Sequence, residues 1–97
     1  MRISLLIGAA LLAAAPAAAA PPDDFKRLLD DHYAWLLRES PTYATALGVR
    51  DHDDRIEDLS LAARDRRARE AAAFLERLGR IPAESLSPAD RVNRAIL

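Results

Sequence analysis

The stretch RESPTYATALG, residues 38–48, decides how the chain folds, because one amphipathic segment ends there and another begins within two residues. Ser40 can accept hydrogen bonds from the unpaired N–H groups of a new helical turn. Pro41 suits the first position of a helix, since the N–H that it lacks would have no partner there. Gly48 offers the left-handed backbone conformation that commonly ends a helix. The stretch therefore predicts a corner between two helices.

The apolar pattern on both sides of this corner predicts an all-α fold of three to four amphipathic helices. In the first helix, Phe25, Leu29, His32 and Leu36 are spaced four, three and four residues apart, so we expect them to form one buried stripe. No segment shows the alternation of apolar and polar residues that is typical of a strand. The helices are expected at about residues 25–39, 41–47, 61–78 and 88–97.

Serines mark the starts of the two later helices. Ser60 is expected to cap the third helix, which should end at Gly79, and Ser87 followed by Pro88 should open the fourth. The apolar line of the third helix is rich in alanine, which permits close approach by another helix. This line comprises Leu61, Ala68, Ala71, Ala72, Leu75 and Leu78.

Residues 49–59 lack a helical period and hold five carboxylates within residues 51–58, so they predict an exposed acidic loop. We expect Ile56 and Leu59 to anchor this loop to the helices. A calcium-binding loop starting at Asp51 would need an oxygen ligand at the fifth position and glycine at the sixth, where Arg55 and Ile56 stand. The pattern therefore argues against an EF-hand.

The first 19 residues have the organisation of a signal peptide. A positive charge at Arg2 precedes an apolar run over residues 3–15, and residues 17–19 are the small alanines that signal peptidases favour. The apolar run is shorter than the roughly 20 residues that span a bilayer, which argues against a transmembrane anchor. We therefore expect export to the periplasm or the medium, with no membrane association after removal of the signal.

The cleavage is expected between Ala19 and Ala20, because a cut one residue later would place Pro21 directly after the scissile bond. Residues 20–24 then form a short linker rich in proline and aspartate, and Asp23 or Asp24 is expected to cap the first helix. The chain contains no cysteine, which excludes disulfides, thiolate metal sites and a lipid-acceptor cysteine in this sequence.

The charge of the predicted mature chain is nearly balanced. Its 13 basic residues, the 14 of the whole sequence less Arg2, face 15 acidic ones. The arginines at positions 64, 66, 67 and 69 are interleaved with acidic residues, so a solvated helix face is favoured over a phosphate or nucleic-acid site. The sequence therefore gives no reason to expect a nucleic-acid partner.

Two histidines are the candidates for chemistry, and for both a structural interpretation is favoured. His32 could be a ligand or a proton carrier, but no second group stands at a fixed spacing from it, so a histidine at the core edge is expected. His52 could join neighbouring aspartates on a cation, but a solvated turn is favoured. Neither begins a zinc-protease motif, and the serines stand where helix caps are expected. The sequence therefore predicts no catalytic residue, metal site or cofactor in this chain.

Several short motifs, in their order along the chain, resemble the N-terminal region of the bacterial domain-of-unknown-function 885 family. The likeness covers most of residues 25–97. Its most specific parts are the corner at residues 40–42, the aspartate-leucine-serine cap at residues 58–60 and the second serine-proline start at residues 87–88.

The resemblance implies a much longer, mostly helical and often exported parent. The distal half of family members carries a His-Glu element similar to that of helical zinc peptidases, so the resemblance implies that the full-length parent is a metal-dependent hydrolase or peptidase with zinc as its cofactor. No position of this sequence matches that element. The missing lipid-acceptor cysteine implies a form that is not anchored to a membrane.

The resemblance and the small apolar content together predict a scaffold segment. Residues 92–97 continue an apolar helical pattern without a stop signal, so we expect the helical domain to continue beyond Leu97. The expected partner is then the remainder of the same polypeptide, and the isolated chain should be molten or aggregated. The alternative is a small exported helical module that binds a protein or peptide. The oligomeric state stays open.

Overall fold

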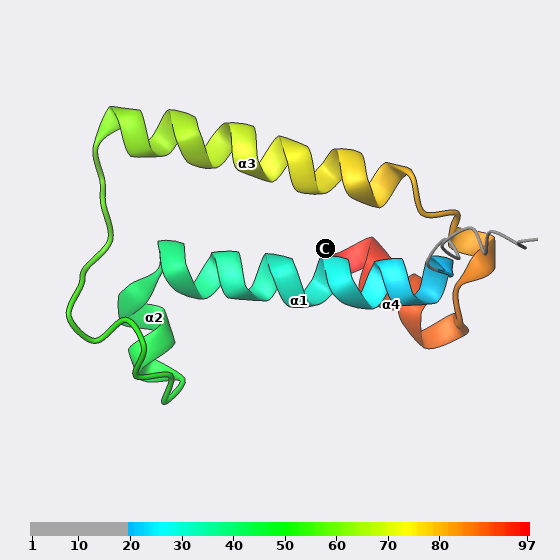
Figure 1. Ribbon diagram of the computed structural model, residues 1–97, viewed down its shortest axis with the longest axis horizontal. Coiled ribbons are helices and arrows are strands. Elements are labelled where there is room, and N and C mark those ends of the chain that lie inside the picture. The colour runs from blue at the N-terminus through cyan, green and yellow to red at the C-terminus, as the bar shows by residue number, and fades with distance from the viewer. Residues whose placement is uncertain (1–19) are drawn as a thin grey trace, which may run out of the picture.

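A computed structural model describes residues 20–97. The predicted signal peptide, including Ala19 of the predicted cleavage bond, lies outside these described residues. The described part is built of α-helices without a strand, which confirms the predicted all-α fold (Figure 1). Its elements are α1 (Pro21–Glu39), α2 (Pro41–Ala46), α3 (Leu61–Gly79), the short 3-10 helix η1 (Ala83–Ser85) and α4 (Pro88–Ile96).

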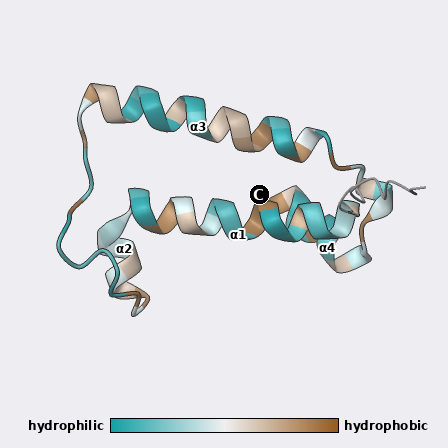
Figure 2. Ribbon diagram, viewed as in Figure 1, coloured by the Kyte–Doolittle hydropathy of each residue, from teal (hydrophilic) through white to brown (hydrophobic). Residues whose placement is uncertain are grey.

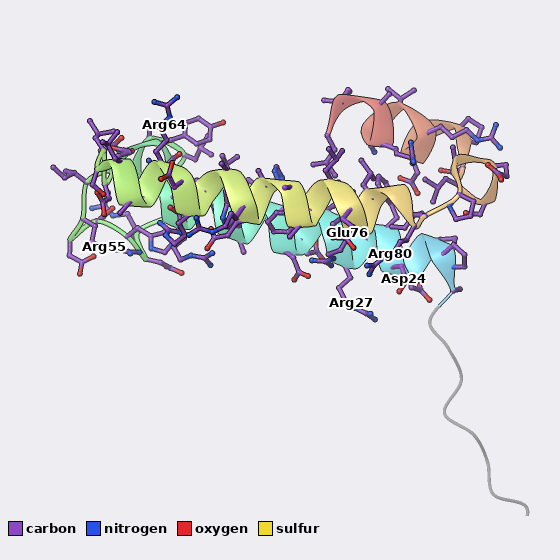
Figure 3. The ribbon with its side chains drawn as sticks, turned by 90° about the horizontal axis from the view of Figure 1, so that it is seen from above. Asp24, Arg27, Arg55, Arg64, Glu76 and Arg80 are labelled. Atoms are coloured by element: carbon purple, nitrogen blue, oxygen red, sulfur yellow. The ribbon has the colours of Figure 1, made fainter. Side chains whose placement is uncertain are left out.

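The two long helices α1 and α3 lie side by side and run antiparallel (Figure 1). Helix α2 turns away at the end of α1, and the loop of residues 47–60 returns the chain to the start of α3. Helix α4 lies to one side of the α1–α3 pair, near the start of α1, as the view from above also shows (Figure 3). No helix within residues 20–97 is long and apolar enough to cross a membrane.

Helix α1 begins four residues earlier than predicted, so the predicted linker at residues 20–24 is wrong. Ala20 is the N-cap residue, and its carbonyl accepts the N–H groups of Asp23 and Asp24, each at 3.0 Å. Prolines at the first two helical positions lose no hydrogen bond there. The two aspartates therefore lie in the first turn, where negative charge is favourable, and make no side-chain cap.

The corner at residues 38–48 forms as predicted, but Ser40 does not cap it with its side chain. Ser40 is the N-cap residue of α2, yet its side chain makes no capping hydrogen bond, and its N–H donates to Leu36 O of α1 at 2.9 Å. Ala44 is fully buried. Gly48 has a φ of 84°, the only positive value in the described part of the chain, and therefore ends α2 as expected.

The other expected caps are present. Ser60 Oγ accepts the N–H of Ala63 at 3.1 Å at the start of α3, and Ser87 Oγ accepts the N–H of Asp90 at 3.1 Å at the start of α4. Gly79, expected to end α3 by a left-handed turn, instead lies within its last turn and has no positive φ.

A small apolar core lies where the start of α1 meets the end of α3 and the segment around η1. It consists of Phe25, Leu28, Leu78, Ile81 and Leu86, each less than a tenth exposed. The predicted stripe of α1 is therefore only partly right: Phe25 is buried, but Leu28 takes the fully buried position, while Leu29, His32 and Leu36 are half-buried.

Most of the predicted apolar line of α3 faces away from the core. Leu61 is 75% and Leu75 69% exposed, and the alanines at positions 68, 71 and 72 are exposed too, so that only Leu78 of the line is buried. Figure 2 shows that apolar and polar residues follow one another in short alternating stretches along α3. The predicted loop anchors Ile56 and Leu59 are also wrong, since both are at least 80% exposed.

Helix α4 buries no residue, and two of its arginines bond to the preceding segments. Arg91 Nε donates to Ala83 O and Leu86 O, each at 3.1 Å. At the end of α3, Arg94 Nε donates to Ile81 O at 3.3 Å and Arg94 Nη2 donates to Leu78 O at 3.4 Å. Positive charge at these carbonyls satisfies acceptors that a helix end leaves free and complements the helix dipole.

Candidate functional site

Five polar side chains join α1 to α3 where the apolar core does not reach. This seam network consists of Trp35 and Glu39 of α1 and Arg66, Arg67 and Glu70 of α3. Arg66 donates to both carboxylate oxygens of Glu39, at 2.9 and 2.7 Å, and to Glu70 Oε2 at 2.9 Å. Arg67 lies 3.5 Å from Glu39. Arginine therefore bridges two carboxylates on different helices, in the geometry that suits its planar fork.

Burial makes Glu39 the centre of this network. Its side chain is only 9% exposed, although Arg66 remains 41% exposed. Hydrogen bonds from Arg66 and then from Arg67 hold the pKa of Glu39 below its usual value. The two carboxylates in turn raise the pKa of Arg66. The carboxylate is therefore ionised and engaged, which makes it a structural acceptor and a poor general base.

Trp35 ties the network to a cluster of aromatic rings. Its indole N–H donates to Glu70 Oε2 at 2.6 Å, and this bond, followed by that of Arg66, lowers the pKa of Glu70. The Trp35 ring lies 5.6 Å from that of Phe74, and His32 meets Phe74 edge-on at 5.2 Å. His32 is half-buried against these two rings. It therefore packs at the edge of the interior, where its environment is aromatic.

Two depressions flank this region and share Arg38. The first, here called the aromatic groove, has a volume of about 290 Å³ and is lined by Trp35, Arg38, Glu70, Ala73, Phe74 and Arg77. The second, here called the arginine cleft, has a volume of about 520 Å³ and lies between the end of α1, the acidic loop and α3. Its lining is Arg38, Glu39, Pro41, Arg55, Ile56, Asp58 and Arg66.

Carboxylates hold the acidic loop to the helices on either side of it. Glu57 Oε1 accepts from the N–H of Thr42 at 3.1 Å and from its hydroxyl at 2.5 Å, so Glu57 supplies the cap that Ser40 was expected to give α2. Asp58 accepts the N–H of Ser60 at 2.9 Å. Thr42 and Ser60 hold the pKa values of Glu57 and Asp58, respectively, below their usual values.

The second candidate histidine lies in this loop, away from the seam network. Arg55 lies 2.6 Å from His52 Nδ1, so the ring is engaged by a cation. Within residues 20–97, no three His, Cys, Asp or Glu side chains come close enough together to hold a metal ion. The residues present therefore do not fit the zinc that the family resemblance implies for the parent. His32 and His52 belong to separate regions and form no common site.

The seam network is the feature that sequence reasoning missed. Arg66 and Arg67 were assigned to a solvated face, whereas they turn inward onto Glu39. The acid–base pair of Arg66 and Glu70, four residues apart, was the one local signal available. The Glu39–Arg66 and Trp35–Glu70 bonds join residues 27 and 35 positions apart, for which the sequence carries no spacing rule.

The comparisons with known proteins agree with the resemblance drawn from the motifs. No curated protein and no solved structure matches the chain. A family model described as bacterial protein of unknown function (DUF885) matches residues 41–97, which is more than half of the sequence. The match begins at the proline of the corner and includes both later helices. On these grounds the chain belongs to the DUF885 family of bacterial proteins.

Proposed function

We propose that this chain is an N-terminal scaffold segment of an exported DUF885 protein, and that the rest of the same polypeptide covers its exposed apolar face. The observation that carries the proposal is the exposure of large apolar side chains on α3 and α4, which together are called the apolar face below. Leu61 and Leu75 of α3 and Val92 and Ile96 of α4 are each more than half exposed. Helix α4 buries no residue at all. Apolar surface of this kind is typical of an interface.

The site chemistry is consistent with a scaffold. Glu39, the least exposed of the ion-paired side chains in residues 20–97, accepts from Arg66 with both oxygens, so it holds two helices together and is not free to accept a proton. No group near it combines a nucleophile with a base in the manner of a hydrolytic site. We therefore assign the seam network to positioning α1 against α3.

The remainder of the proposal concerns the parent and its location. We propose a metal-dependent hydrolase of peptides or related amides, with this segment forming one wall of its substrate cleft. The family resemblance supports that assignment, and the signal-peptide pattern of residues 1–19 supports export to the periplasm or the medium. No step of the reaction is assigned to residues 20–97.

Self-association of the chain tests the scaffold role. If the apolar face needs a cover, the chain should self-associate in sedimentation velocity as its concentration rises and should bind a hydrophobic dye. Replacing Leu75 and Ile96 together with lysine should abolish both effects and leave the helical circular dichroism unchanged, because both side chains are exposed. This double variant is called the solubilised variant below.

A matched control separates the loss of apolar surface from the gain of charge. Lysine at Ala62 and Asn93, one exposed position on each of the same helices, adds the same charge but leaves the apolar face intact. This control should associate like the unmodified chain. A chain that is monomeric and binds no dye at high concentration would contradict the scaffold role and favour a small independent binding module.

A further inference from the structure

We propose that the aromatic groove binds an apolar residue that carries a free carboxylate, such as the C-terminal residue of a peptide. The inference goes beyond the scaffold role, because it assigns a ligand class to a groove within the described helices, whatever reaction the parent performs. Three features of the groove carry it: an aromatic floor, an arginine with open donors at its rim, and a neighbouring cleft whose other charged side chains are already engaged.

The floor of the groove suits an aromatic or aliphatic side chain. Trp35 and Phe74 contribute two rings whose centroids lie 5.6 Å apart with an interplanar angle of 58°. The N–H of Trp35 is held by Glu70, so the orientation of the indole is fixed before any ligand binds. Ala73 is the smallest side chain of the lining, and the volume of about 290 Å³ accommodates one large side chain. A mostly apolar pocket with a few polar groups at its edge is the usual form of a small-ligand site.

Arg38 supplies the open cation. Its nearest acidic group within the described residues is Glu39, 3.6 Å from Arg38 Nε, and both oxygens of Glu39 already accept hydrogen bonds from Arg66. The Arg38 side chain is half exposed at the rim of the groove. Its guanidinium can therefore offer a pair of N–H groups to a carboxylate, the geometry in which arginine binds such groups best.

The position of Arg38 places the anion at one end of the groove. Arg77, at the other end, is already engaged by Asp31 at 2.8 Å and lies over the Phe74 ring at 5.6 Å, so it closes the aromatic floor. Glu70, the acidic group of the lining, accepts from Trp35 and Arg66 through Oε2, so this oxygen is already engaged. A ligand whose carboxylate lies beside Arg38 and whose apolar group packs on Trp35 would therefore fit both the rim and the floor of the groove.

The arginine cleft extends this arrangement on the far side of Arg38. It adds Arg55, whose side chain is half exposed, and Arg66. Its two acidic members are already engaged: Glu39 by Arg66, and Asp58 by the N–H of Ser60. The guanidinium of Arg55 already contacts His52 Nδ1 and that of Arg66 binds Glu39 and Glu70, so Arg38 is the arginine best placed to receive a carboxylate.

Trp35 is the only tryptophan in the chain and lies in the groove, so its fluorescence reports binding directly. The experiment titrates the full chain, at low micromolar concentration, with N-acetyl-phenylalanine and with its uncharged amide. We expect a saturable change of Trp35 emission with the acid in the millimolar range. The amide should bind about tenfold more weakly, since it loses a charge-assisted pair of hydrogen bonds.

Three variants make the test specific. Arg38→Gln should remove the preference for the acid over the amide, and Ala73→Leu should fill the groove and abolish the response without changing any charge. Arg64→Gln, at an exposed residue that projects away from the α1–α3 pair (Figure 3), should behave like the unmodified chain. Helical circular dichroism of each variant confirms that the fold is kept.

The proposal is overturned if neither ligand changes Trp35 emission saturably, if acid and amide bind equally, or if Arg38→Gln retains the preference. None of these results bears on the scaffold role, which depends on self-association through Leu75 and Ile96. A chain that self-associates but shows no selective binding would keep the scaffold role and refute the groove.

Discussion

Replacing Glu39 with glutamine tests whether the seam network holds α1 against α3. The variant loses the charge that accepts two hydrogen bonds from Arg66, at 2.9 and 2.7 Å, in a side chain only 9% exposed. Hydrogen bonds to charged groups contribute roughly 1.5–3 kcal/mol each when they are buried. Arg66 is 41% exposed and keeps Glu70 as a partner, and the glutamine oxygen can still accept one bond. We therefore expect the free energy of unfolding to fall by about 1–2 kcal/mol.

The assay is urea unfolding of the solubilised variant with and without Glu39→Gln, followed by Trp35 fluorescence and helical circular dichroism. Since the pKa of Glu39 is lowered in the folded chain, its stabilisation is fully present above the ordinary value of 4.5 and is lost as pH falls through the lowered pKa. The difference between the two proteins should therefore be constant from neutral pH down to about pH 5 and shrink in more acidic solution.

Glu76→Gln is the matched control for this experiment. Glu76 of α3 pairs with Arg80, the C-cap residue of that helix, at 2.5 Å, but both side chains are about 70% exposed (both are labelled in Figure 3). Its loss should not measurably change the free energy of unfolding. If Glu39→Gln were as mild as the control, or if its effect did not depend on pH below 5, the seam network would contribute nothing to the fold.

Two further predictions concern helix ends, each with its own control. Gly48→Ala should destabilise the fold by about 1 kcal/mol, because φ is 84° and the space for a Cβ is open, so the cost is backbone strain. Gly79→Ala, in the last turn of α3 with equally open space, should instead stabilise by about 0.5 kcal/mol. Ser60→Ala should cost about 1 kcal/mol through loss of its bond to the Ala63 N–H, whereas Ser40→Ala should be nearly neutral. Thermal unfolding of the solubilised variant measures all four changes, and reversed ranks within either pair would contradict the assigned cap geometry.

The helices were predictable because the signals that start and stop them act within a few residues. Pro41 begins α2, and Gly48 follows its end. Ser60 and Ser87 each accept the N–H of the third residue after them, as their positions before apolar segments indicated. The start of α1 was missed because two prolines and two aspartates were interpreted as a linker. The same residues suit a first helical turn equally well.

The buried faces were not predictable, since periodicity says that a helix has an apolar side but not what meets it. On α3 the residues nearest α1 include Arg66 and Glu70, because Glu39 and Trp35 stand opposite and bind them. The apolar side of α3, with Leu75, is left exposed. Long polar side chains therefore occupy the seam that the apolar pattern had assigned to leucine and alanine.

By itself the sequence determined an all-α chain, the places where α2, α3 and α4 begin, and its family. These depend on backbone geometry, capping and residue order, which are properties of neighbouring positions. Only the tertiary structure decided which faces meet, that Glu57 caps α2 in place of Ser40, and that Glu39 joins two helices through Arg66. The physical reason is that these bonds link residues 15 and 27 positions apart, so they exist only once the corner and the loop have brought the helices together.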